Sequence, residues 1–168
     1  MYDLVMGGGE TTGDEPGNKL KPTDFDFFPT EGAAAGILYV FNTLKENFLL
    51  KPGDTIAIIT PIFSPYLEMP KLANYDLNIV ELRTNPDKNY ALDDDEINKL
   101  KNKKIKGLFM VNPANPGAFA LPKDNIDKIG KLVNTERQDM FVLSDSVYSP
   151  FVKRGAYNSF MLSCPKNT

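Results

Sequence analysis

Short apolar runs recur along the chain and alternate with amphipathic segments. Residues 55–60 read Thr-Ile-Ala-Ile-Ile-Thr, a continuous run rich in β-branched side chains. Such a run is typical of a strand that is buried on both faces of a sheet. Shorter or more mixed runs at 77–82, 106–111 and 140–143 predict further strands.

Apolar residues at helical spacing predict two longer helices. From residue 31, a helical stripe predicts a helix that ends near residues 49 and 50; its apolar positions are Ile37, Leu38, Val40, Phe41, Leu44 and Phe48. Lys51-Pro52-Gly53-Asp54 then stops it. Residues 122–134 carry the second stripe. Its apolar positions are Ile126, Ile129, Leu132 and Val133.

Two further segments carry weaker helical signals. Residues 67–75 predict a short helix that is interrupted by Pro70. The acidic run at 93–96 precedes Ile97 and Leu100, which is the acid-rich start and the capping-box spacing of a helix. We interpret these four carboxylates as helix-capping charges and not as a metal site.

The alternation of strands and helices defines the fold class. Strand-helix-strand units at this spacing favour parallel pairing and right-handed crossovers, which is an α/β architecture. A chain of 168 residues has room for about one such core, so we place one domain at 31–168. Residues 1–30 are rich in Gly, Pro and polar residues with little periodicity, and they predict an N-terminal loop or arm.

Composition excludes several classes of function. The net charge of -3 is spread along the chain, which gives no reason to expect nucleic acid or an anionic membrane as a partner. The sequence lacks an apolar run of about 18 residues that could span a bilayer. Cys164 is the only cysteine, which suggests a reducing, cytoplasmic setting. The absence of histidine removes imidazole bases and most zinc sites.

Polar residues follow two of the predicted strands. Asn112 and Asn115 come after the strand at 106–111, and Asp145 and Tyr148 come after the strand at 140–143. Ligands of open α/β sheets bind in the crevice beyond the carboxyl ends of the strands, so these residues are candidates for a site. Each has a plain alternative as well, since an Asn-Pro pair can be a turn, an Asp a cap and a Tyr part of the core.

Two other stretches are candidates for the same crevice. Pro61-Ile62-Phe63-Ser64-Pro65-Tyr66 makes a stiff turn that presents Phe63 and Tyr66 at the carboxyl end of the strand at 55–60, although the Phe63 ring can also belong to the core. The helix that begins near Gly32, Ala33 and Ala34 leaves its first N–H groups open to an anion. Small residues at a helix start more often indicate close packing of that helix against a neighbour.

The motifs together resemble the fold-type I pyridoxal-phosphate enzymes, the aminotransferase superfamily. Asn112-Pro113-Ala114-Asn115-Pro116 is similar to the family's Asn-Pro-x-Asn-Pro, and Asp145-Ser146-Val147-Tyr148 is similar to its Asp-x-x-Tyr. The segments 31–35, 50–54, 60–68 and 108–113 look most like the aspartate 4-decarboxylase branch, whose members resemble aspartate aminotransferases. The resemblance implies a three-layer fold with a mostly parallel sheet, here an incomplete version of the family's large domain.

The resemblance implies a site for pyridoxal 5'-phosphate. Asp145 would lie against the ring nitrogen, where a carboxylate keeps that nitrogen protonated. Asn115 and Tyr148 would hold the phenolic oxygen of the cofactor, and Phe63 would stack on the ring. Gly32, Ala33 and Ala34 match the cup for the phosphate, although relatives usually carry a hydroxyl residue where this chain has Ala34. No metal site is implied.

The function implied by the resemblance is that of part of a pyridoxal-phosphate enzyme acting on aspartate. The reaction would be amino-group transfer to a 2-oxo acid, β-decarboxylation to alanine, or both, in a homo-oligomer. The Schiff-base lysine is expected beyond Thr168, and the substrate-binding arginine later still, so no catalytic residue is assigned within the chain. The alternative is a truncated, catalytically inactive α/β domain with a binding or assembly role.

Overall fold

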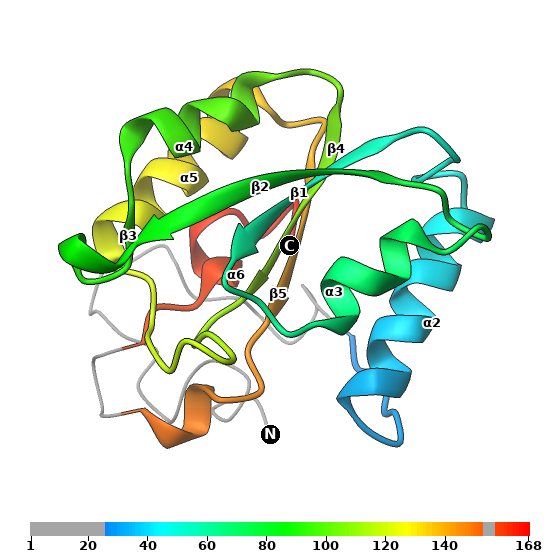
Figure 1. Cartoon of the computed structure of the whole chain (residues 1–168), viewed down its shortest axis with the longest axis horizontal. Coiled ribbons are helices and arrows are strands. Elements are labelled where there is room, and N and C mark those ends of the chain that lie inside the picture. Colours follow the sequence, from blue (N-terminus) through cyan, green and yellow to red (C-terminus); the bar gives the residue numbers. More distant parts are fainter. Residues whose placement is uncertain (1–25, 153–156) are drawn as a thin grey trace.

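The computed structural model of the chain describes residues 26–152 and 157–168. Figure 1 shows the arrangement of its helices and strands. In chain order they are α2 (Ala33–Glu46), β1 (Thr55–Thr60), α3 (Pro65–Glu68), η1 (Met69–Lys71), β2 (Asn78–Asn85), η2 (Pro86–Lys88), β3 (Ala91–Leu92), α4 (Asp94–Asn98), η3 (Lys99–Lys101), β4 (Ile105–Val111), α5 (Lys123–Glu136), β5 (Phe141–Asp145), η4 (Ser149–Phe151) and α6 (Phe160–Ser163).

The strands form one sheet in the order β3-β2-β1-β4-β5. β1 is parallel to both β2 and β4, and β4 is parallel to β5, which confirms the predicted parallel pairing. Only the two-residue strand β3 runs antiparallel to its neighbour within the described sheet. The carboxyl ends of β1, β4 and β5 therefore lie at one edge, the lower side of Figure 1.

The sheet separates two apolar cores. On β1, Ile56 and Ile58 pack on the side of α2 and α3, whereas Ala57 and Ile59 pack on the side of α4, α5 and α6. These four side chains are at most 5% exposed, so the prediction of a strand buried on both faces is confirmed. Helices on both faces of a mostly parallel sheet make the three-layer α/β fold that the sequence predicts.

The two predicted long helices are present with shifted ends. The helix predicted at 122–134 is α5, and its predicted apolar stripe is buried. The first predicted helix is α2, but it stops at Glu46. The assignments of Leu38 and Phe48 to its apolar stripe are wrong, and Leu38 is 43% exposed on the outer side of the helix. Phe48 has a φ of 59° and is 77% exposed, because the chain turns there and buries Leu50 instead.

The capping-box interpretation of residues 93–96 is wrong in its detail, although the helix does begin there as α4. Within the described residues, the Asp93 side chain makes no capping hydrogen bond. Its carboxylate instead accepts hydrogen bonds from Lys88 and Asn85. The Glu96 carboxylate accepts from Lys99 and from the backbone N–H of Arg83. The carboxylates of Asp93 and Glu96 therefore bind these donors and not the N–H groups at the start of the helix.

The N-terminal arm predicted at 1–30 falls almost wholly outside the described residues, and residues 26–30 form neither helix nor strand. Within the described part of the chain, no helix is long and apolar enough to cross a membrane.

A buried arginine joins the layer of α4 and α5 to the sheet. Arg137 is fully buried, and its guanidinium donates hydrogen bonds to the backbone carbonyls of Leu100, Asn102 and Ile105. It also donates twice to the Asp139 carboxylate at 3.0 Å, which lowers the pKa of that carboxyl. The charge is thus paired, and the carbonyls at the start of β4 are satisfied.

We expect Arg137→Ala to lower the free energy of unfolding by about 3 kcal/mol, because it leaves buried carbonyls without donors. Urea denaturation measures the change. The control is Lys103→Ala, since Lys103 also pairs with Asp139 but is 70% exposed, and we expect a loss below about 0.5 kcal/mol. Equal losses for the two variants would contradict this account.

Candidate functional site

The pairing of β4 with β5 brings the two polar motifs together. Val111 lies opposite Asp145 in the parallel register. One residue further along, the backbone N–H of Asn112 donates a hydrogen bond of 2.8 Å to the carbonyl of Asp145. The loops that carry Asn115 and Tyr148 therefore leave the sheet side by side.

Asn112 does not face the crevice, and its selection as a candidate site residue is wrong. The side chain is 1% exposed, and its Oδ1 accepts a hydrogen bond of 2.9 Å from the backbone N–H of Leu121. Its Nδ2 has no hydrogen-bond partner among the described residues. Asn112 therefore ties the loop after β4 to the segment before α5, which is a structural role.

Asn115 and Tyr148 are in contact beyond the carboxyl ends of β4 and β5. The Asn115 Nδ2 donates a hydrogen bond of 3.3 Å to the Tyr148 Oη, although the two residues are 33 positions apart. Asn115 is partly buried and Tyr148 is 40% exposed. An amide and a phenol that meet at an accessible position can both turn toward a ligand oxygen, so this pair is a candidate for binding one.

The Asp145 carboxylate is held on both of its oxygens. Oδ1 accepts from the backbone N–H of Val147 at 3.2 Å, and Oδ2 accepts from the Tyr66 hydroxyl at 3.1 Å. Asp145 itself is partly exposed at the carboxyl end of β5. A carboxylate has about four acceptor positions, so it keeps acceptor capacity for a further donor from the crevice.

The contact between Tyr66 and Asp145 is one that the sequence does not predict. The placement of Tyr66 at the end of β1 follows from the turn with Pro61 and Pro65, but its partner lies 79 positions away on β5. The side chain is 2% exposed. Burial, followed by the charge and hydrogen bond of Asp145, raises the pKa of the Tyr66 phenol well above its ordinary value.

Phe63 lies in the same turn and is partly buried against the core on the side of α2. The Phe63 carbonyl accepts a hydrogen bond of 3.0 Å from the backbone N–H of Tyr66. The turn thus sets the positions of both residues at the carboxyl end of β1. Whether the ring stacks on a ligand stays a prediction.

The start of α2 lies on the same side of the molecule, because α2 runs back to the beginning of β1 through a short loop (Figure 1). Ala33 and Ala34 are exposed, and Gly32 has a φ of 139°. No side chain of the described residues caps this helix start. The nearby Glu31 carboxylate accepts from the Tyr39 hydroxyl at 2.8 Å, which lowers the pKa of Glu31.

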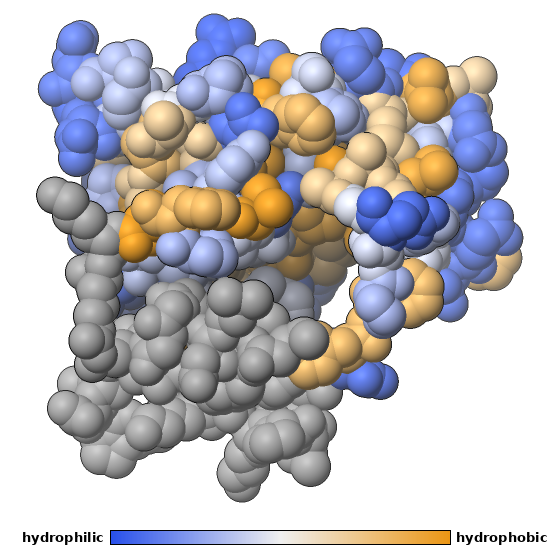
Figure 2. Space-filling view, turned by 90° about the horizontal axis from the view of Figure 1, so that it is seen from below, coloured by the Kyte–Doolittle hydropathy of each residue, from blue (hydrophilic) through white to orange (hydrophobic). Residues whose placement is uncertain are grey.

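The side of the molecule at these strand ends combines polar and apolar residues, as the view from below in Figure 2 shows. Val147 and Tyr148, directly after β5, are 49% and 40% exposed, and Phe28, just before α2, is 79% exposed.

A group of hydroxyls flanks Asp145 and also escaped the sequence analysis. The Ser146 Oγ and the Tyr157 Oη are 2.7 Å apart, and the Ser144 Oγ lies 3.4 Å from the Ser146 Oγ. Tyr157 is 7% exposed, and burial raises the pKa of its phenol. This group links the turn after β5 to the segment before α6. No local pattern marks it, because Ser is common in turns and Tyr157 is 11 positions from Ser146.

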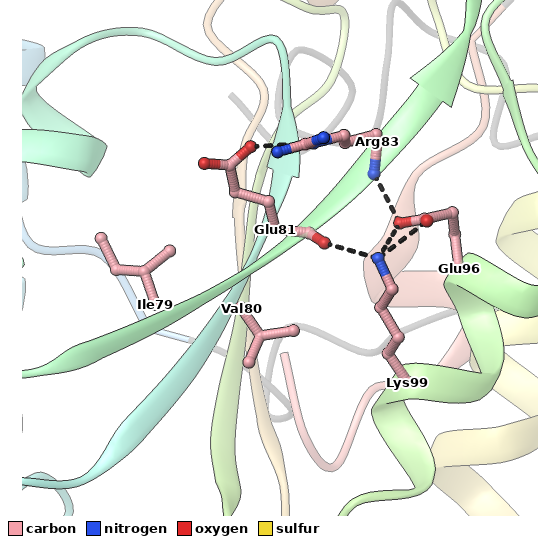
Figure 3. A pocket seen from close by; sticks show the side chains of 6 residues that line it. All are labelled: Ile79, Val80, Glu81, Arg83, Glu96 and Lys99. Atoms are coloured by element: carbon pink, nitrogen blue, oxygen red, sulfur yellow. Dashed lines mark hydrogen bonds and ion pairs between the residues drawn. The ribbon is translucent and has the colours of Figure 1, made fainter.

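A hollow on β2 is lined by residues of β2, α4 and η3 (Figure 3). The charged side chains around it pair with one another, and two of them bind backbone groups on the free edge of β2. Lys99 donates to the carbonyl of Glu81 at 3.1 Å, and Glu96 accepts from the N–H of Arg83 at 2.8 Å. These contacts cover backbone groups that would otherwise attract another strand. We interpret the hollow as edge protection.

A parallel sheet with converging polar groups at its carboxyl edge defines a small-molecule-binding α/β domain. The sequence places it in a particular family. Residues 19–162 match the family Aminotransferase class I and II, and the chain belongs to this family. The resemblance read from the two motifs is thereby confirmed.

Curated relatives and solved structures agree with this assignment. The bifunctional aspartate aminotransferase and L-aspartate beta-decarboxylase of a Pseudomonas species is 38% identical over 152 residues, which are 90% of this chain and 28% of that protein. The aspartate/prephenate aminotransferase of Thermus thermophilus is 24% identical over 90% of this chain and 37% of that protein. The chain thus spans between 28% and 37% of the length of these two relatives.

Two solved structures share the fold. Cystalysin from Treponema denticola, whose structure contains a pyridoxal 5'-phosphate cofactor, superposes with a TM-score of 0.64 and 29% identity, over 76% of this chain and 32% of that one. A mutant of Thermus thermophilus aspartate aminotransferase gives a TM-score of 0.67 and 25% identity, over 79% of this chain and 35% of that one.

The two asparagines of the first motif should respond differently to truncation. We expect Asn112→Ala to lower the free energy of unfolding by about 2 kcal/mol, because the buried N–H of Leu121 loses its acceptor. The matched variant Asn115→Ala should change it by less than about 0.5 kcal/mol, since its one contact is accessible to water. Thermal or urea unfolding measures both, and a larger loss for Asn115→Ala would reverse our assignment.

Proposed function

We propose that the chain is the cofactor-binding portion of a pyridoxal-phosphate enzyme that acts on aspartate. The observation that carries the proposal is the 3.3 Å hydrogen bond between Asn115 and Tyr148 beside the held carboxylate of Asp145. Residues of both family motifs meet there, at the carboxyl edge where α/β sheets bind ligands. The cofactor found in the cystalysin structure supports the same choice of ligand.

Asp145 would bind the pyridine nitrogen of the cofactor. When bound, pyridoxal phosphate supplies an electron sink that depends on a protonated ring nitrogen. A carboxylate against that nitrogen favours its protonated form. Asp145 suits this role because it is partly exposed and retains free acceptor positions.

Asn115 and Tyr148 would donate to the phenolic oxygen of the cofactor. Both are neutral donors, so they stabilise an oxygen anion without a permanent charge. Phe63 would lie against the face of the ring and exclude water from it. Its position beside Tyr66 at the end of β1 supports that role.

The start of α2 would hold the phosphate. Ala33 and Ala34 are exposed and uncapped by any described side chain, so the first N–H groups are free to donate to an anion. Because Ala34 carries no hydroxyl, the backbone N–H groups and the helix dipole would do most of the holding.

The reaction would be amino-group transfer from aspartate to a 2-oxo acid, release of its β-carboxyl group to give alanine, or both. The names of the Pseudomonas and Thermus relatives support aspartate as the substrate. The placement of the Schiff-base lysine beyond Thr168 stays a prediction, as do a homo-oligomeric assembly and a cytoplasmic location. The activity is therefore proposed for the whole protein that carries these residues.

Product analysis tests this proposal. We expect the protein, supplied with pyridoxal phosphate and aspartate, to form oxaloacetate when a 2-oxo acid is present, or alanine and carbon dioxide. Chromatography of the products distinguishes the two reactions. If the cofactor is bound and neither product forms, aspartate is not the substrate.

The role of Asp145 is tested by Asp145→Ala. We expect the dissociation constant for pyridoxal phosphate to rise by about tenfold or more, because a charge-assisted hydrogen bond to the ring is lost. Absorbance titration measures the affinity. The control is Asp127→Ala on the exposed side of α5, which should bind the cofactor as the unchanged chain does. Unchanged affinity in Asp145→Ala would remove Asp145 from the site.

A further inference from the structure

We infer that Phe119 and Tyr90 are positioning residues for Asn115: their stacked rings fix the loop after β4 in the placement from which the Asn115 amide donates. The inference rests on the proposed function, because it concerns how the proposed donor to the phenolic oxygen of the cofactor is held. Neither ring belongs to the two motifs that carry the family resemblance.

Asn115 lies in a short turn whose ends are tied together. The backbone N–H of Ala114 donates a hydrogen bond of 2.7 Å to the carbonyl of Phe119, and the N–H of Ala118 donates one of 2.9 Å to the carbonyl of Ala114. Ala118 has a φ of 52°, in the left-handed region that tight turns use. Residues 114–119 therefore form one closed unit, and the placement of this unit sets the direction of the Asn115 side chain.

The Phe119 ring connects this turn to the rest of the molecule. A Cβ built on Gly117 would lie 2.3 Å from the ring, so the ring rests directly against the glycine. The same built atom would lie 3.4 Å from Pro61, which places the turn against the start of the loop after β1. Phe119 is partly buried and packs on the core on the side of α4, α5 and α6. Movement of the ring therefore moves the turn.

Tyr90 supports the Phe119 ring. The two ring centroids are 4.3 Å apart and the ring planes differ by 5°, so the rings are stacked. Tyr90 lies between η2 and β3, and its backbone N–H donates a hydrogen bond of 2.9 Å to the carbonyl of Asn85. Stacked rings attract one another beyond the area that they bury. The stack therefore opposes any displacement of Phe119.

The segment that carries Tyr90 is itself fixed to α5. The backbone N–H of Leu92 on β3 donates to the Asn125 Oδ1 at 2.8 Å, and the Leu92 carbonyl accepts from the Asn125 Nδ2 at 3.0 Å. Asn125 is 3% exposed and belongs to α5, the helix that follows the Asn115 loop. Tyr90 is thus a rigid support, and rigid support is what a preorganised donor requires.

The experiment uses two ligands that differ only at the phenolic oxygen. They are pyridoxine 5'-phosphate and its analogue in which hydrogen replaces the phenolic hydroxyl. Neither carries an aldehyde, so neither forms an imine with the lysines of the chain. Equilibrium dialysis of the full chain measures both dissociation constants. A misplaced Asn115 weakens only the ligand that has the phenolic oxygen, whereas a general loss of structure weakens both.

Phe119→Ala and Tyr90→Ala remove the stack, and Tyr90→Phe is the matched control that keeps it. We expect Asn115→Ala to weaken the binding of pyridoxine phosphate by about fivefold to tenfold, the effect of one hydrogen bond. The two stack variants should weaken it by about threefold to fivefold, because the donor is present but misplaced. Tyr90→Phe should stay within about twofold of the unchanged chain. All four variants should bind the analogue as the unchanged chain does.

A double variant tests whether Tyr90 acts through Asn115. If the ring only positions the amide, Tyr90→Ala should add less than about twofold to the effect of Asn115→Ala. A further loss of about threefold to fivefold in the double variant would overturn the inference. An equal loss of both ligands in the stack variants would overturn it as well.

Urea unfolding of each variant checks that the fold is retained. Tyr90→Ala leaves the core contacts of Phe119 in place, so it carries the test if Phe119→Ala does not fold. If Asn115→Ala weakens the binding of pyridoxine phosphate but Tyr90→Ala does not, the inference is wrong and the proposed function stands. If Asn115→Ala binds it as tightly as the unchanged chain, the proposed role of Asn115 fails and the inference fails with it.

Discussion

The parallel register between β4 and β5 is the constraint on which the candidate site depends. Val111 lies opposite Asp145, and the N–H of Asn112 donates to the Asp145 carbonyl at 2.8 Å. Side chains alternate between the faces of a strand, so a slip of one residue would turn Asp145 away from Tyr66. The same slip would separate the loops that bring Asn115 to Tyr148. Site geometry is thus a consequence of strand pairing.

Packing on the α2 face of the sheet helps to hold that register. Gly107 pairs with Phe141 in the ladder, and a Cβ built on Gly107 would lie 2.2 Å from the Phe141 ring. The aromatic ring therefore covers the glycine, and no other residue fits below it in this register. On the same face Phe109 stacks on Phe41 of α2 with ring centroids 5.2 Å apart. The helix whose start is proposed to hold the phosphate is packed directly on the strand that leads to Asn115.

Much of this arrangement was predictable from the chain, and the failures have identifiable causes. Strands and long helices follow from hydrophobic period, and the crossovers place Asp145 and Tyr148 beside Asn115. Phe48 was misjudged because an apolar residue just after a helix continues its period while the backbone turns away. Asn112 was misjudged because a polar side chain buried on a backbone N–H cannot be told from one that faces a ligand. Tyr66 could be placed near the crevice, but a partner 79 residues distant is set by tertiary packing alone.

The central claim is that the crevice binds the ring of pyridoxal phosphate with Asp145 on its nitrogen. Nitrogen NMR of the bound cofactor, labelled with ¹⁵N in the ring, tests this most directly because the chemical shift reports whether that nitrogen carries a proton. The account predicts that the nitrogen of the bound ring stays protonated to a higher pH than the nitrogen of the free cofactor in the same buffer. A bound ring nitrogen that is unprotonated and titrates as it does in water would contradict it.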